Sequence, residues 1–341
     1  MTRKIKIIII ICISCCCQVY AQRGGESLFG IQNVPQSPRV AALGSNQVGI
    51  YGADLALLIN NPAILDSALT NHISISYTPY LADINYGFAA YSRTFNNIGN
   101  FALGFSQIGY GKFIGADEYG NLEGEFSANE TVIQLVYSKK ILPQWHVGAS
   151  LKPIFSRIET YSAWGLGFNA GFFYKSTNEL TTAGFVLRNV GRQINAYNEK
   201  IENMRPDIQI GLSTKLAHAP FRFSVTMQDI LSRSLLYVVD DENVNPYWKN
   251  DNTLKGKWIN DVFRRFTFGV EIVPTKNFYI GAGYNPRRRQ EMKIESNLST
   301  VGFTWGFGIK VYKFNISYGS GLYHLAGNTN HFSITTNLSS F

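Results

Sequence analysis

The chain has 341 residues, a formal net charge of +8 and 31 glycines, and 14% of its residues are aromatic. This positive charge is too mild and too dispersed to indicate nucleic-acid binding, and beyond the first residues no apolar run approaches the roughly 20 residues of a membrane helix. Abundant glycine and aromatic residues are instead typical of a large β-barrel.

Residues 1–21 predict a secretory signal peptide, with a basic start, a short apolar core and the small residue Ala21 before the cut. A lipoprotein signal cut before Cys15 or Cys17 is the alternative. The mature chain keeps 28 basic and 23 acidic residues, a net charge of +5. It is expected to have no disulfide and no cysteine metal site, because all four cysteines lie in the leader: Cys12, Cys15, Cys16 and Cys17.

The segment 22–71 is expected to form a plug. Asp54 is placed to cap a short helix that runs to Ile59. The run Asn60, Asn61 and Pro62 should end that helix, since proline disfavours the helical region for the residue before it. One short helix ahead of a chain that otherwise consists of strands suggests a barrel plug. A helix lying on a soluble β-domain is the alternative.

Residues 72–341 read as an outer-membrane β-barrel with both termini periplasmic. Alternation with period two is clearest from 300 to 311, where bulky apolar residues alternate with glycine, threonine and lysine. A soluble sandwich would carry many more charges on its exposed face. Here the apolar face is expected to meet lipid and the small polar face to line a lumen.

About fourteen strands are predicted, and the connections between them mostly alternate between short and long, as in outer-membrane barrels. The chain ends on Phe341, as many such barrels end on an aromatic residue. The fold class is therefore an all-β transmembrane antiparallel barrel with a short N-terminal helical plug. The expected strands are 72–79, 84–94, 100–109, 128–140, 145–158, 161–175, 180–190, 207–217, 220–229, 263–273, 277–286, 300–311, 312–319 and 331–341.

No constellation of catalytic residues is visible. The sequence has neither a Ser-x-x-Lys pattern nor a Gly-x-Ser-x-Gly elbow, and its five histidines lack metal-ligand spacing. We therefore expect no enzyme activity, no catalytic residue, no metal and no cofactor. The acidic, glycine-containing stretch 116–125 either forms a solvated hairpin or holds a calcium ion.

Two further stretches are candidates for contacts outside the barrel. The connection 230–262 is the longest, and long aromatic-bearing loops are good candidates for protein interfaces. A lid over the barrel is the alternative reading of this loop. The arginine run 287–289 suits a solvated loop or anionic lipid such as lipopolysaccharide better than DNA. The partner-binding candidates are Tyr237, Tyr247, Trp248 and Trp258.

The plug segment resembles the N-terminal segment of barrels related to the long-chain fatty-acid channel and the type IX secretion shuttle barrel. Those barrels carry an Arg-x-Ala-(Ala/Gly)-x-Gly run, a short helix and an Asn-Pro-Ala turn. The resemblance implies a barrel of that superfamily and says nothing about cargo. The matching residues are Arg39, Ala41, Ala42, Gly44, Asn61, Pro62 and Ala63.

Four further runs resemble the PorQ family, the type IX secretion barrels of the Bacteroidetes. They are 80–87, 110–113 with 117–120, 187–191 and 216–224. The resemblance implies a non-enzymatic barrel in the outer membrane of a Gram-negative bacterium. In the attachment complex, a sortase and its shuttle barrel would join this barrel, which would hold a surface-exposed subunit. The complex as a whole would deliver cargo onto lipopolysaccharide.

The alternative function is a passive channel for hydrophobic small molecules, by analogy with the fatty-acid barrels. Such a channel needs an apolar pocket in the lumen and a lateral gap in the wall. The strand faces expected to line the lumen are polar and rich in glycine, which favours the secretion reading over the channel.

Overall fold

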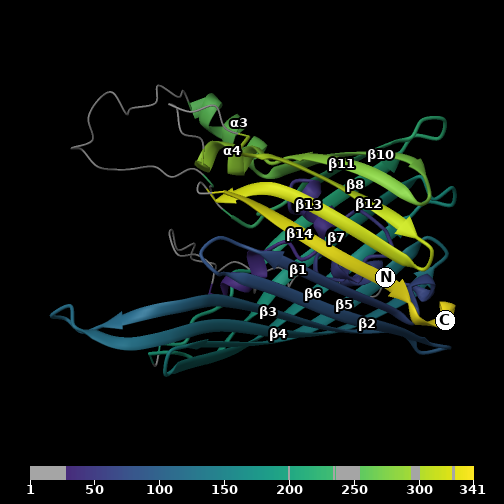
Figure 1. Ribbon diagram of the computed structural model, residues 1–341. Coiled ribbons are helices and arrows are strands. Elements are labelled where there is room, and N and C mark those ends of the chain that lie inside the picture. Colours follow the sequence, from purple (N-terminus) through teal and green to yellow (C-terminus); the bar gives the residue numbers. More distant parts are fainter. Residues whose placement is uncertain (1–27, 199, 233–234, 236–253, 293–299, 325–326) are drawn as a thin grey trace, which may run out of the picture.

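A computed structural model shows a closed antiparallel barrel of fourteen strands with the N-terminal segment packed inside it (Figure 1). It describes residues 28–198, 200–232, 235, 254–292, 300–324 and 327–341. The barrel closes between its first and last strands, where His72 pairs with Asn337. The predicted fold, a barrel of about fourteen strands with a short helical plug, is confirmed. The predicted signal peptide lies outside the described residues.

The strands are β1 (His72–Pro79), β2 (Asn85–Phe95), β3 (Gly99–Ala116), β4 (Leu122–Leu142), β5 (Trp145–Ile158), β6 (Tyr161–Lys175), β7 (Thr181–Asn195), β8 (Asp207–Lys215), β9 (Phe221–Met227), β10 (Phe266–Thr275), β11 (Phe278–Tyr284), β12 (Phe303–Val311), β13 (Phe314–His324) and β14 (Gly327–Asn337). The helices are α2 (Pro38–Ala42), α3 (Leu254–Arg264) and α4 (Pro286–Met292), with 3₁₀ turns η1 (Gly30–Asn33), η2 (Leu55–Ile59), η3 (Pro62–Ile64), η4 (Ser67–Leu69) and η6 (Leu338–Ser340).

The outer face of the barrel is apolar and the inner face is polar. In β12, Trp305 and Phe307 point outward and are exposed, whereas Thr304 is buried in the lumen. The same alternation runs along most of the other strands. The closed part of the barrel leaves no unpaired strand edge, and an exposed apolar belt around it is stable only in lipid. The architecture is that of an outer-membrane barrel.

The two ends of the barrel differ. Short turns follow the even-numbered strands, and the C-terminus lies at that end, which we call the short-turn end (Figure 1). The opposite long-loop end carries the connections 196–206, 228–265 and 285–302, together with α3 and α4. The predicted alternation of short and long connections therefore holds in part, because the connections 80–84 and 159–160 at the long-loop end are also short. The 320–330 connection is shorter than predicted, because β13 continues to His324 and β14 starts at Gly327.

The predicted loop 110–127 is wrong in its length. β3 and β4 run on to Ala116 and Leu122 and form a hairpin that projects beyond its neighbours (Figure 1). The pairing of β2 with β3 stops at Gly109, and that of β4 with β5 stops at Ala128. The acidic stretch is the tip of this hairpin, which favours the hairpin reading over the calcium one. No cluster of three potential metal ligands occurs among the described residues.

The C-terminal strand and two loop-end strands also differ from expectation. The last strand ends at Asn337, and Phe341 follows a 3₁₀ turn, with its ring 5.9 Å from that of Phe314. This break explains why Phe341 does not share the alternation of the strand. The predicted strand 263–273 begins only at Phe266, because residues 254–264 form α3. The predicted strand 277–286 ends at Tyr284, and the arginine run 287–289 lies on α4. No helix within the described ranges has the length and apolarity needed to span a membrane.

An arginine placed on the lipid-facing surface should destabilise the barrel. Ile210 lies in the middle of β8 and points outward. We expect Ile210→Arg to lower the free energy of unfolding by about 2–4 kcal/mol, the cost of arginine near the bilayer midplane. Urea unfolding in lipid vesicles measures it. Tyr119→Arg at the hairpin tip is the control, and equal stability of the two variants would contradict a membrane-embedded β8.

Candidate functional site

The plug, residues 28–71, is held in shape by side chains that cap its short helical turns. The Ser37 hydroxyl accepts a hydrogen bond from the Val40 amide and donates one to Asp54. Asp54 also accepts from the Ala56 amide at 2.9 Å, which caps η2 as the sequence predicts. Each cap satisfies amides that a helix start leaves free. Burial raises the pKa of Asp54, and the hydrogen bonds it accepts oppose that shift.

The predicted turn at Asn60, Asn61 and Pro62 ends η2 and starts η3. Asn61 is fully buried. Its amide nitrogen donates to the Val48 carbonyl within the plug and to the Phe172 carbonyl on β6, and its Oδ1 accepts from the Ala63 amide. The Asn61 side chain therefore hydrogen-bonds the turn both to the rest of the plug and to the barrel wall.

Glycines in the wall let the plug approach the strands closely. A Cβ added at Gly184 on β7 would lie 2.0 Å from the Val48 carbonyl oxygen, and one at Gly148 on β5 would lie 2.5 Å from the Ala63 amide nitrogen. On the other side of the barrel, a Cβ at Gly319 on β13 would lie 2.2 Å from the Pro38 carbonyl oxygen. These contacts are backbone against backbone, so neither side has room to yield. The glycine-rich lumen face is therefore a seat for the plug.

One buried ion pair joins the plug to the wall. The Arg39 guanidinium on α2 makes two bonds to the Glu271 carboxylate on β10, at 2.7 and 2.8 Å, and donates to the Tyr51 carbonyl at 2.9 Å. Arg222 on β9 reaches the same carboxylate at 3.2 Å. Bidentate arginine–carboxylate pairs are strong and directional. Burial opposes the charge of Arg39, but the Glu271 carboxylate outweighs it and raises the arginine pKa.

Two cavities lie at opposite ends of the plug. The long-loop cavity has a volume of about 670 Å³ and reaches inward to Asn60, and the short-turn cavity has about 530 Å³ and ends at Asp66. Between them Leu57, Ile64 and Leu65 are at most 1% exposed. In this state the plug therefore separates the two ends of the lumen.

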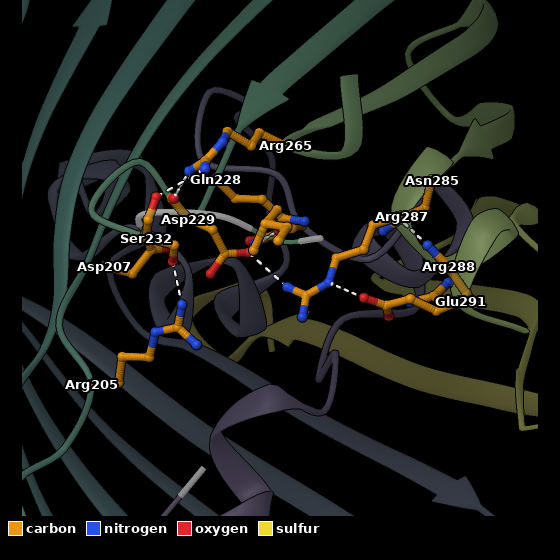
Figure 2. Close-up of polar contacts among 12 residues, drawn as sticks. Arg205, Asp207, Gln228, Asp229, Ser232, Arg265, Asn285, Arg287, Arg288 and Glu291 are labelled. Atoms are coloured by element: carbon orange, nitrogen blue, oxygen red, sulfur yellow. Dashed lines mark hydrogen bonds and ion pairs between the residues drawn. The ribbon is translucent and has the colours of Figure 1, made fainter. Parts of the chain in front are cut away.

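Charged side chains bridge the rim of the long-loop cavity, as Figure 2 shows. Arg287 on α4 lies between Asp229, at 2.9 Å, and Glu291, at 2.7 Å. Arg288 stacks over the Tyr323 ring at 4.0 Å and donates to the Ser45 hydroxyl of the plug. The arginine run that the sequence analysis assigned to loop or lipid contacts thus supplies two side chains to the cavity.

The predicted site residues that the structure describes lie in two separate parts of the molecule. Asn60, Asn61 and Pro62 lie in the plug, whereas Trp258 lies on α3 at the long-loop end and is 68% exposed. Tyr237, Tyr247 and Trp248 lie outside the described residues. The sequence analysis missed Glu271, whose signal is a carboxylate on an otherwise small and polar lumen face. Its partner Arg39 was noted only as part of the resemblance.

The same fold occurs in solved channel structures. The toluene transporter TodX of Pseudomonas putida is 12% identical, with a TM-score of 0.54 over 90% of this chain and 98% of that chain. A TodX deltaS2 mutant is 13% identical, with a TM-score of 0.51 over 90% and 98%. The CymD monoaromatic hydrocarbon channel is 12% identical, with a TM-score of 0.50 over 91% and 99%. At this identity the likeness concerns the fold.

No protein-family profile and no curated protein matches the chain. The resemblance to the PorQ family and the type IX attachment complex therefore stays a prediction.

Proposed function

We propose that the chain is an outer-membrane channel for small hydrophobic molecules, closed by its plug in the state described. The observation that carries this proposal is the pair of cavities at the two ends of the lumen, with buried residues of the plug between them. A structural barrel that merely anchors a partner has no need of a cavity reaching inward from each end.

The long-loop cavity is not polar throughout. The strand faces are polar, as predicted, and most of the residues that line the cavity are polar or charged, but the plug adds apolar side chains that an analysis of strands alone does not count. Apolar side chains in a cavity give a small hydrophobic molecule a surface to bind. The apolar contributions come from Leu28, Val34, Pro35 and Ile59 of the plug and from Met204.

The known channels of the same fold suggest the first substrate to test. TodX is described as a toluene transporter and CymD as a monoaromatic hydrocarbon channel. A flat aromatic hydrocarbon is small enough for a cavity of about 670 Å³. We therefore choose toluene as the probe.

Uptake into cells tests the channel, because lipopolysaccharide slows hydrocarbons where phospholipid does not. Cells without their own hydrocarbon channels should take up labelled toluene faster when they make this protein. A hydrophilic solute of similar mass is the control and should enter at an unchanged rate. Toluene uptake equal to that of cells with an empty vector would refute the proposal for this substrate class.

Docking of a surface subunit is a second candidate function, favoured by the projecting hairpin. Beyond Gly109 and Ser127 the outer edges of β3 and β4 have no strand partner among the described residues, and the tip exposes Ile114, Tyr119 and Leu122. Unpaired edges with exposed apolar residues suit strand addition by a protein partner. Residues 110–127 are thus a second candidate docking segment for an attachment-complex partner, and the candidates in the loop 230–262 stay a prediction.

Shortening the hairpin tests this second function. Replacing 111–126 by a tight turn removes the free edges without touching the barrel wall. If a surface subunit docks here, it should co-purify with the intact protein from detergent-solubilised outer membrane and be lost from the shortened variant. Equal recovery of the same proteins with both chains would exclude the hairpin as the docking site.

A further inference from the structure

A bulge in β7 turns two neighbouring side chains into the lumen. Arg188 and Asn189 together oppose the single residue Asn169 of β6, and Asn189 takes a left-handed φ of 57°. Successive strand residues normally point to opposite faces, but here both point inward. Bulges of this kind re-aim side chains and are frequent beside functional sites.

The bulge brings two buried cations to one place. Lys152 on β5 is 4% exposed and Arg188 is 8% exposed. The Lys152 ammonium donates to Asn189 Oδ1 at 2.7 Å and to Gln32 Oε1 of the plug at 3.4 Å. Among the described residues, the hydrogen bonds of Arg188 are two long contacts of 3.5 Å, to Asn46 Oδ1 and Gln209 Oε1. Neither cation forms a salt bridge within the described residues, although a buried charge is costly without one.

Two hydrogen-bond donors at the β7 bulge lack acceptors. Arg188 Nε and Asn169 Nδ2 are buried and have no hydrogen-bond partner among the described residues. Most buried polar atoms in proteins are paired, so each exception calls for an explanation. The facing carboxylate, Asp207, accepts from Gln209 through Oδ2 at 2.7 Å, whereas its Oδ1 is buried without a partner among the described residues. Asp207 and Asp229 both act electrostatically on Arg188. Arg188 Nε and Asn169 Nδ2 nevertheless lack acceptors, and Lys152 has no carboxylate partner among the described residues.

We propose that Lys152, Arg188 and Asn169 form a binding site for an oxyanion, a phosphate or carboxylate group that enters from the long-loop cavity. Arg188, Asn189 and Gln32 line that cavity, so the site opens onto about 670 Å³ of space. An oxyanion supplies acceptors for Arg188 Nε and Asn169 Nδ2 and a negative charge for Lys152. The site concerns binding alone and does not depend on transport of hydrocarbons.

Calorimetric titration of the detergent-solubilised protein tests the site. The probes are inorganic phosphate, and octyl phosphate below its micelle concentration, which carries the same group on an apolar tail. Charge-assisted hydrogen bonds are strong enough that Lys152→Gln and Arg188→Gln should each weaken binding about tenfold or more. Lys152→Arg keeps the charge and should retain most of the affinity.

Lys175→Gln is the matched control. Lys175 belongs to the short-turn cavity and is paired with Glu179 at 2.9 Å, so its loss should leave phosphate binding unchanged. Binding of both probes identifies a site for free oxyanions, and binding of octyl phosphate alone identifies the head group of an amphiphile. The proposal is overturned if neither probe binds. It is also overturned if folded variants, identified by the heat-modifiable migration of an intact barrel on gels, bind phosphate as tightly as the unchanged protein. If the protein binds phosphate but does not speed toluene uptake, the oxyanion site stands and the proposed channel function fails.

Discussion

Glu271→Gln should open the lumen. The substitution keeps the shape of the side chain but leaves the buried Arg39 and the partly exposed Arg222 without the carboxylate that they share. Removing one partner of a buried ion pair costs about 3–5 kcal/mol, and every 1.4 kcal/mol changes an equilibrium about tenfold. If that energy holds the plug in place, the open population should rise about a hundredfold or more. Conductance across a planar bilayer measures it.

Two controls separate release of the plug from general damage. Lys112→Gln removes an exposed ion pair with Glu125 on the projecting hairpin, and such pairs are worth about 1 kcal/mol at most, so conductance should not change. The double variant Arg39→Met with Glu271→Met replaces the buried pair by apolar side chains of similar size. The double variant should conduct less than Glu271→Gln, because it removes both Arg39 and Glu271 and so leaves no buried charge of the plug without its partner. Wild-type conductance in Glu271→Gln would show that the ion pair does not hold the plug.

Gly184→Val should expel the plug from its seat on β7. The new Cβ would lie 2.0 Å from the Val48 carbonyl oxygen, and that clash between wall and plug backbone has no side chain to absorb it. Overpacking usually costs about 1–3 kcal/mol, and we expect the upper end of that range here. Limited proteolysis in detergent measures the effect, since an expelled plug is cut where a seated one is protected.

Gly87→Val is the matched control for the glycine seat. Gly87 lies in β2 of the same wall, and nothing lies within 4 Å of a Cβ added there. Both substitutions place a β-branched residue in a strand, where it is well tolerated. Equal protease protection of the two variants would mean that the plug does not depend on close packing against the wall glycines.

Most of the barrel could be predicted from one sequence, because a lipid-facing strand must alternate. The predicted strands 145–158 and 161–175 coincide with β5 and β6, whose outward bulky and inward small residues alternate over most of their length, with Ile154 and Phe173 as bulky inward exceptions. The prediction failed at 110–127. Glycine and acidic residues there read as loop, yet Phe113 stacks on Phe126 and Lys112 pairs with Glu125 across the hairpin. Cross-strand pairs of this kind are visible only once the register is known.

The site divides in the same way into local and long-range parts. The capping role of Asp54 and the turn at Asn61 could be predicted because each residue acts on its own neighbours. The pair of Arg39 with Glu271 joins positions 232 residues apart, and nothing local in the sequence connects them. The apolar lining of the long-loop cavity was missed because it comes from the plug and not from the strands.

Cysteine labelling tests most directly whether the plug divides the lumen. A mature chain starting at Gln22 has no cysteine, so Asn46→Cys, Ser67→Cys and Ala56→Cys each introduce one. Asn46 lines the long-loop cavity and Ser67 the short-turn cavity, whereas Ala56 is 1% exposed between them. With a membrane-impermeant thiol reagent on both sides, the first two should react and Ala56→Cys should not, until Glu271→Gln is added. Equal labelling of all three in the otherwise unchanged protein would mean an open lumen and would contradict a plugged channel.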